Sequence, residues 1–282
     1  MDKWSIGVFA SIDAGLGVKL EVVRELGIHT IQLHTPSPST RTQQHANEFA
    51  AKLRDYGIEI TTLFLGFDGE SYASIAITAD TVGFVPKATR AARLAEAKQI
   101  SEFAKLLNVT AIGSHIGFVP HDTKSAEYGE VVSTIQELAA HLKENGQALH
   151  LETGQESVEG LLGFISATGC DNIFINFDPA NLILYGIGDP IGNLKKVAKF
   201  VRGVHCKDAI ATTGKPGVDW GSEVPFGKGQ VDAEAFLRTL NEIGYEGALT
   251  IEREIPEEPS RQKEEIAGAV RLIEQVKKKV LG

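Results

Sequence analysis

Long apolar runs, cysteines and clusters of basic residues are all scarce in this chain of 282 residues. No stretch approaches the roughly 18 continuous apolar residues that a membrane-spanning helix needs, and the opening MDKWSIGVFASID is too polar for a signal peptide. The two cysteines, Cys170 and Cys206, favour free thiols in a reducing compartment. We therefore expect a cytoplasmic protein with no membrane partner.

The charge balance is acidic, with a formal net charge of −9 and no Lys/Arg cluster that could follow a phosphate backbone, so we expect no nucleic-acid partner. Hydrophobic residues make up 43% and charged residues 23%, values typical of a soluble globular protein. The length suits one closed α/β barrel, which typically has about 250 residues. We expect a single domain over residues 1–282.

Strand-like and helix-like patterns alternate eight times along the chain, which predicts a parallel sheet closed into a (β/α)8 TIM barrel. The strands are expected at 4–10, 29–35, 58–66, 109–116, 148–153, 172–178, 201–206 and 247–253. The helices are expected at 17–26, 42–56, 87–107, 125–145, 157–168, 191–199, 232–243 and 261–280. Five of these helices end where a left-handed cap is wanted, at Gly27, Gly57, Gly146, Gly169 and Gly244.

An open, doubly wound sheet is the alternative architecture. It would carry a phosphate-binding glycine fingerprint after its first strand. Gly15 and Gly17 stand there without a third glycine in register, so this segment is interpreted as a turn into a helix.

Two connections, residues 66–86 and 208–232, are longer than barrel loops usually are. Both follow carboxyl-terminal ends of strands, the face on which barrel enzymes keep their chemistry. The second is punctuated by glycine and contains Trp220, as expected of a lid that excludes water. Surface elaboration without function is the alternative.

Four predicted strands end in a side chain that can bind a metal: Glu152, Asp178, His205 and Glu252. Neighbouring strands lie about 4.8 Å apart, so four successive strand ends can reach one ion. Three carboxylates and one imidazole suit Mn²⁺, Mg²⁺, Co²⁺ or Zn²⁺, and donor type alone does not choose among them.

Each of the four residues also has a simpler interpretation. Glu152 could pair with a lysine at the barrel rim, and Asp178 before a proline could cap a turn. His205 could be a hydrogen-bonded core histidine. Glu252 could belong to a solvated network, and Glu254, on the same face of the strand, is its rival as the last ligand.

The same strand ends carry a family resemblance. The runs LET (151–153), DPAN (178–181), HCKD (205–208) and IE (251–252), with FGKG (226–229), resemble the sugar phosphate isomerase/epimerase superfamily of xylose isomerase-like TIM barrels. That family includes ketose 3-epimerases, hydroxypyruvate isomerases and inosose dehydratases. The resemblance implies that Glu152, Asp178, His205 and Glu252 hold one divalent metal ion and that Glu152 and Glu252 are the catalytic acid/base pair.

The chemistry implied is proton removal next to a sugar carbonyl through an enediolate, giving an epimerase or an aldose–ketose isomerase. An inosose-type dehydratase and a carbohydrate-binding barrel without catalysis are the alternatives. The chain departs from ketose 3-epimerases, which have histidine where Asn181 stands and arginine shortly after the position of His205. A DNA-repair branch of the same superfold needs more metal-binding histidines than this acidic chain offers.

Further residues are candidates for substrate binding, namely His115, Glu156, Asn181, Lys207 and Trp220. Asp208 could instead neutralise Lys207, and Glu156 could simply favour a helix start. His34 closes another strand and could reach a hydroxyl. Aromatic residues that would form a sugar-binding wall or pack in the core are Trp4, Phe9, Phe64 and Phe67. Barrels of this kind often pair, so a homo-oligomer is compatible with the chain.

Overall fold

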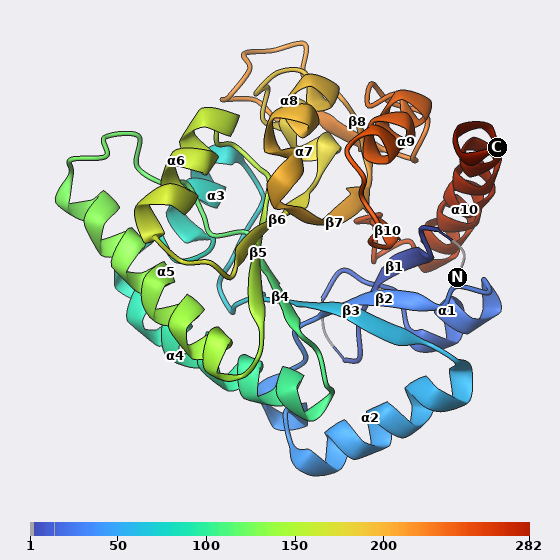
Figure 1. Cartoon of the computed structure of the whole chain (residues 1–282), viewed down its shortest axis with the longest axis horizontal. Coiled ribbons are helices and arrows are strands. Elements are labelled where there is room, and N and C mark those ends of the chain that lie inside the picture. The colour runs from blue at the N-terminus through green and yellow to red at the C-terminus, as the bar shows by residue number, and fades with distance from the viewer. Residues whose placement is uncertain (1–2, 14) are drawn as a thin grey trace.

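A computed structural model describes residues 3–13 and 15–282, and eight strands within them form a closed parallel barrel (Figure 1). The barrel strands are β1 (Ile6–Ala10), β2 (Thr30–His34), β3 (Glu59–Phe64), β4 (Ala111–Ser114), β5 (Ala148–Glu152), β6 (Ile173–Phe177), β7 (Val201–Cys206) and β10 (Leu249–Ile251). Around the ring they follow the order β1-β10-β7-β6-β5-β4-β3-β2. The pairing of β1 with β10 closes the ring and rules out the open sheet.

Helices surround the barrel on its outer side (Figure 1). They are α1 (Leu20–Glu25), α2 (Gln43–Tyr56), α4 (Lys87–Leu106), α5 (Ala126–Glu144), α6 (Val158–Thr168), α8 (Pro190–Val197), α9 (Ala233–Glu242) and α10 (Pro259–Leu281). Their ends follow from local chemistry: the Ser125 hydroxyl accepts from the Tyr128 N–H at the start of α5, and the five predicted cap glycines all have φ between 62° and 72°. The predicted TIM barrel is confirmed.

Three short helical segments and one hairpin were not predicted. They are α3 (Ile75–Thr81), α7 (Pro179–Leu184), the 3₁₀ turn η1 (Pro38–Thr40), and the antiparallel pair β8 (Asp208–Ile210) and β9 (Ser222–Val224). The predicted helix 191–199 ends in a further 3₁₀ turn, η2 (Ala198–Phe200). Helix α3 lies in the long connection 66–86, and the hairpin occupies much of 208–232. These elements are too short to give a periodic signal. Those that follow a strand shape the mouth of the barrel, whereas η2 comes directly before β7 and lies at its other end.

The segment with Gly15 and Gly17 is a turn, as predicted. A Cβ on Gly17 would lie 2.5 Å from the Cα of Ala10, so the chain can fold back against β1 only with glycine there.

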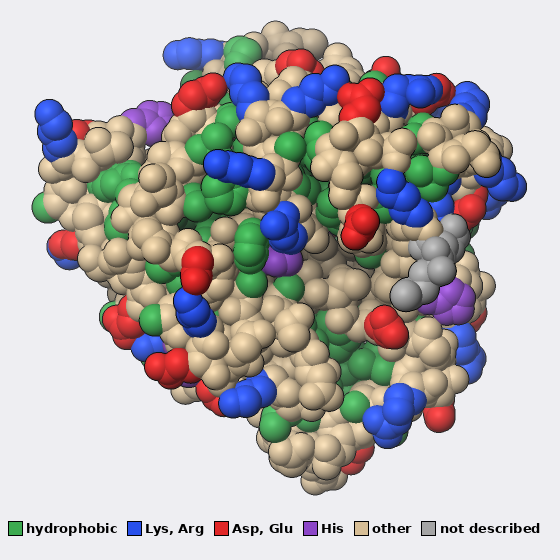
Figure 2. Space-filling view, in the orientation of Figure 1, with side chains coloured by type: hydrophobic (Ala, Val, Ile, Leu, Met, Phe, Trp, Pro, Cys, Tyr) green, Lys and Arg blue, Asp and Glu red, His purple; other side chains and the backbone are tan. Residues whose placement is uncertain are grey.

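Packing and surface agree with the composition. Apolar side chains from the strands and the inner faces of the helices form one buried cluster. Over the face shown in Figure 2, Lys and Arg side chains are interspersed with Asp and Glu. Among the described residues, no helix combines the length and apolarity needed to cross a membrane.

Candidate active site

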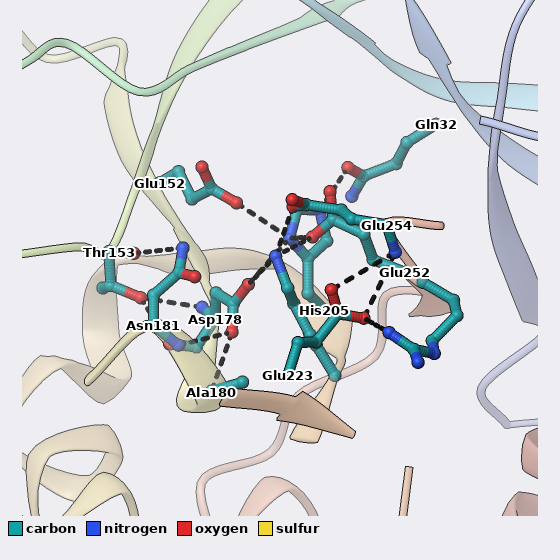
Figure 3. A network of polar contacts seen from close by, with 12 residues as sticks. Gln32, Glu152, Thr153, Asp178, Ala180, Asn181, His205, Glu223, Glu252 and Glu254 are labelled. Atoms are coloured by element: carbon teal, nitrogen blue, oxygen red, sulfur yellow. Dashed lines mark hydrogen bonds and ion pairs between the residues drawn. The ribbon is translucent and has the colours of Figure 1, made fainter. Parts of the chain in front are cut away.

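Four side chains from neighbouring strand ends converge at the mouth of the barrel (Figure 3). Glu152 ends β5, Asp178 follows β6, His205 lies on β7 and Glu252 follows β10. One potential ligand atom from each lies within 4.8 Å of those of the other three. These four residues could hold one metal ion between them and are here called the metal cluster. They are the ones predicted from the strand ends.

The imidazole of His205 is the centre of the metal cluster. Its Nδ1 lies 3.0 Å from Glu152 Oε1, 2.9 Å from Glu252 Oε2 and 3.4 Å from Asp178 Oδ2. Burial alone would lower the pKa of His205, but the carboxylates outweigh burial and hold that pKa well above its usual value. Three carboxylates around one buried nitrogen concentrate negative charge at a single point.

Asp178 caps a helix and joins the metal cluster at once. Its Oδ1 accepts from the backbone N–H groups of Ala180 (2.7 Å) and Asn181 (3.1 Å) at the start of α7. This leaves Oδ2 facing His205. The capping interpretation and the metal interpretation of Asp178 are therefore compatible, because each uses a different oxygen.

Gln32 on β2 holds the far side of the His205 ring and was missed by the sequence argument. Its Nε2 donates to Asn176 Oδ1 at 2.9 Å, so its Oε1 accepts from His205 Nε2 at 2.8 Å. That bond leaves Nδ1 as the nitrogen turned toward the carboxylates. The available signal was one buried glutamine between Ile31 and Leu33 in an apolar strand.

Lys207 connects the metal cluster to Glu254. Its Nζ lies 2.5 Å from Glu254 Oε1, 3.3 Å from Glu252 Oε2 and 3.8 Å from Asp178 Oδ2. Burial opposes charging of Lys207, but these carboxylates raise its pKa. Burial also acts against ionisation of Glu252, yet His205 and Lys207 outweigh it and lower the Glu252 pKa, whereas burial raises that of Glu254 to about 7. Glu252 belongs to the metal cluster and Glu254 is the partner of Lys207.

Asp208 does not neutralise Lys207, contrary to that alternative. Its two oxygens accept, at 2.9–3.0 Å, from the backbone N–H groups of Ala209, Gly227, Gly229 and Val231. A Cβ on Gly229 would lie 2.2 Å from Asp208 Oδ1. The HCKD and FGKG runs are therefore linked, because the second wraps its backbone around the aspartate of the first.

A cavity of about 350 Å³ opens above the metal cluster. Glu152 and Glu252 line it, while Asp178 and His205 are fully buried beneath. Both long connections contribute to its wall: 66–86 supplies Glu70 and Tyr72, and 208–232 supplies Trp220 and Glu223. Their predicted place at the mouth is confirmed.

Aromatic rings form much of the wall. The rings of Phe9 and Phe64 lie 6.0 and 5.6 Å from that of His205, and Tyr185 lies 4.7 Å from Trp220. All but His205 line the cavity directly. Such surfaces suit the C–H face of a sugar ring.

Trp4 and Phe67, in contrast, pack in the core. Trp4 Nε1 donates to the carbonyl of Tyr245 at 2.7 Å, and Phe67 packs edge-on against Phe84. Neither lines the cavity.

The remaining candidates separate into two places. Lys207, Asn181, His34 and His115 line the cavity. Glu156 lines a second cavity between the 119–123 segment and α6, so the structure does not bring it to the shared mouth.

Comparison with known proteins agrees with this geometry. Residues 20–276 match the model of the xylose isomerase-like TIM barrel family. The chain belongs to that family. A xylose isomerase domain protein from Planctomyces limnophilus is 54% identical over 99% of both chains, with a TM-score of 0.97.

More distant similarities are to proteins whose names refer to an activity. A D-tagatose 3-epimerase-like protein shares the fold at 17% identity over 96% of this chain and 98% of its own, with a TM-score of 0.72. An inosose dehydratase from Clostridium botulinum is 31% identical over 115 residues, which are 37% of this chain and 38% of the dehydratase. This chain thus aligns with well under half of that relative's length.

The residues of this xylose isomerase-like chain fit a divalent cation. Three carboxylates and one imidazole form a hard donor set of the kind that Mn²⁺ and related ions accept. The carboxylates of Glu152, Asp178 and Glu252 lie within 4.8 Å of one another at a largely buried position, and like charges so close need a counter-charge. One imidazole and the shared Lys207 supply less positive charge than the three carboxylates carry.

Proposed function

We propose that this protein is a divalent-metal-dependent sugar isomerase or epimerase that removes a proton next to a carbonyl. The observation that supports it most is the convergence of the metal cluster beneath a sugar-sized cavity, with two of its carboxylates exposed to that cavity. Mn²⁺, Mg²⁺, Co²⁺ and Zn²⁺ all suit the donor set. A divalent ion bound there would polarise the substrate carbonyl and stabilise negative charge on its oxygen.

Glu152 and Glu252 are the proposed acid/base pair. They come from β5 and β10, the outer two of the four neighbouring strands that carry the metal cluster. Each places one oxygen at His205 Nδ1, which leaves the other oxygen able to exchange a proton with substrate. Proton removal by one carboxylate and return by the other to the opposite face of the same carbon inverts that carbon. Return to the adjacent carbon interconverts aldose and ketose.

Other side chains around the cavity would bind and enclose the substrate. Lys207 and Asn181 lie next to the metal cluster, and His115, directly after β4, also lines the cavity, so these three are the proposed partners of sugar hydroxyls. Trp220 and Tyr72 come from the two long connections and would exclude water while a carbanion-like intermediate exists.

A dehydratase is the second candidate, supported by the partial similarity to inosose dehydratase. The first step would be the same proton removal next to a ketone. Loss of the β-hydroxyl as water, taking up one proton, would then give an enone. Absorbance of that enone would identify this reaction, whereas epimerisation and isomerisation leave the absorbance unchanged.

The test is solvent exchange in D₂O, followed by NMR on free ketoses and keto-polyols with each of the four metal ions. We expect deuterium to enter next to the carbonyl with wild type, and its rate to fall by about 10²–10⁴ in Glu152→Gln while bound metal is largely kept. Glu159→Gln, on the exposed face of α6, is the matched control. Unchanged exchange in Glu152→Gln would refute the acid/base role, and binding without exchange would leave a carbohydrate-binding barrel.

A further inference from the structure

The wall of the cavity is strongly acidic even apart from the metal cluster. Glu70, Glu223 and Glu254 line it together with Glu152 and Glu252. Lys207 is the one Lys or Arg among the described residues that line it. Its ammonium is already in contact with Glu252 and Glu254, so no uncommitted cation faces the space.

The two nearby arginines, Arg253 and Arg93, approach the lining carboxylates Glu223 and Glu70 without lining the cavity themselves. Arg253 Nη1 lies 2.8 Å from Glu223 Oε1, and its Nε donates to Glu265 on α10. Arg93 Nη1 donates to the Gly83 carbonyl at 2.7 Å. Neither arginine lines the cavity, so neither presents the two-pronged donor that a phosphate or carboxylate group selects.

The acidic wall is held by the fold. Glu70 Oε1 accepts from the Gly83 N–H at 2.7 Å and its Oε2 from the Phe67 N–H at 3.0 Å. Glu223 Oε1 accepts from the Glu254 N–H at 3.2 Å, in addition to Arg253. These carboxylates are fixed in place and cannot swing away to admit an anion.

His115, directly after β4, also lines the cavity and is held there by Gln155. Gln155 Nε2 donates to the Gly117 carbonyl at 2.8 Å and to Glu156, so Gln155 Oε1 accepts from His115 Nε2 at 3.0 Å. The other nitrogen, Nδ1, is then an unprotonated acceptor, buried and with no hydrogen-bond partner among the described residues. His115 therefore adds no positive charge to the wall of the cavity.

We infer that the substrate is an uncharged polyhydroxy ketone or aldehyde, carrying neither phosphate nor carboxylate. This rests on the proposed function and narrows its substrate class. Hydroxyl groups donate to ionised carboxylates in strong hydrogen bonds, whereas an anionic substituent would face carboxylates with no free cation to receive it. A divalent ion does not reverse this, because its two charges are fewer than the three carboxylates of the metal cluster.

The test is a fluorescence titration of metal-loaded protein. Trp220 lies in the cavity wall and Trp4 is buried in the core, so a signal lost in Trp220→Phe reports the cavity. The ligands are D-fructose and D-tagatose, a keto-inositol, and the 6-phosphates of the two ketoses. At low salt we expect each ester to bind at least tenfold more weakly than its parent sugar. This gap in affinity between ester and parent sugar should shrink as ionic strength rises.

A charge variant sharpens the test. Glu254→Gln removes a lining carboxylate and leaves Lys207 less compensated, so the gap between ester and parent should narrow severalfold. Glu257→Gln changes the same net charge at an exposed position and should leave the gap unchanged. Esters that bind as tightly as their parents, or no binding by any neutral ligand, would overturn the inference. Neutral ligands that bind without solvent exchange would support it while refuting the proposed function.

Discussion

The two halves of the barrel contribute different kinds of side chain to the same mouth. Strands β5, β6, β7 and β10 deliver the three carboxylates and the imidazole of the metal cluster. Strands β1 to β4 deliver mainly rings, Phe9, Phe64 and the two neutral histidines His34 and His115. Burial lowers the pKa of both histidines, that of His115 to about 4.

This comparison shows that side chains from β1 to β4 act on the metal cluster chiefly by holding the His205 ring in position. Phe9 and Phe64 pack against the His205 imidazole, and Gln32 accepts a hydrogen bond from its Nε2. On the proposed function, the charged half would supply the metal ligands and the acid/base groups, while the other half holds the His205 ring in its orientation. Substitutions on the two sides should therefore fail in different ways.

The largest effect is expected from His205→Ala. Loss of the central ligand should reduce bound divalent ion from about one per chain to near zero, a loss in affinity of at least about 10³-fold. His34→Ala, in the ring-bearing half, should retain the ion. Elemental analysis of both variants, purified without chelator, checks this contrast. Retention of the metal by His205→Ala would contradict the assignment of the metal ligands to the charged half.

Asp208→Ala should chiefly reduce stability. Asp208 is in the charged half but outside the metal cluster, and its removal leaves four backbone N–H groups without their acceptor. We expect a loss of about 3 kcal/mol or more in the free energy of unfolding. Denaturant unfolding measures it, with Asp219→Ala in the exposed loop as a control. A loss of metal with unchanged stability would instead place Asp208 with the ligands.

Gln32→Ala tests the contact between the halves. Without the acceptor at His205 Nε2, we expect metal affinity to fall by about 10–100-fold, because the ring loses its fixed orientation. Gln32→Glu keeps an acceptor and should recover much of that loss. Metal titration of both variants checks it. Equal loss in both would show that Gln32 acts by packing alone.

The smallest effect concerns Glu156, outside the shared mouth. Burial raises its pKa to about 7, so above pH 7 the folded state carries a charge that the unfolded chain tolerates better. Stability should rise as pH falls from 8 toward 5. Glu156→Gln should be more stable than wild type by about 1–2 kcal/mol at pH 8 and equal to it at pH 5. Thermal unfolding at the two pH values checks the sign, and an equal difference at both would refute it.

The alternation of strands and helices was readable in the sequence because each strand is a short apolar run and each helix has caps. Glu152, Asp178, His205 and Glu252 could be named because each follows such a run, so topology alone brings them together. Glu254 could not be separated from Glu252 by strand alternation. The structure separates them through Lys207, which contacts both while only Glu252 reaches His205.

Side-chain partners across the barrel could not be predicted. Gln32 and His205 are 173 positions apart, and nothing in either strand names the other. The placement of Glu156 failed for a related reason. Its distance along the chain from Glu152 suggested the same mouth, but the turn after β5 directs it toward Val119, whose N–H donates to it. The direction in which the chain turns after a strand depends on the loop, and hydrophobic periodicity carries no information about loop geometry.

The place of β10 in the ring would couple metal binding to the opening of the barrel. β10 pairs with β7 on one side and with β1 on the other, and Glu252 comes directly after it. The other three members of the metal cluster come from β5, β6 and β7, which are mutual neighbours. The four side chains can therefore surround one ion only while the seam between β7 and β10 is closed. A divalent ion bound by all four side chains would stabilise the closed seam. Once the ion concentration exceeds the dissociation constant, this stabilisation would grow with the logarithm of the concentration. Metal availability would thereby set how often this seam of the barrel opens.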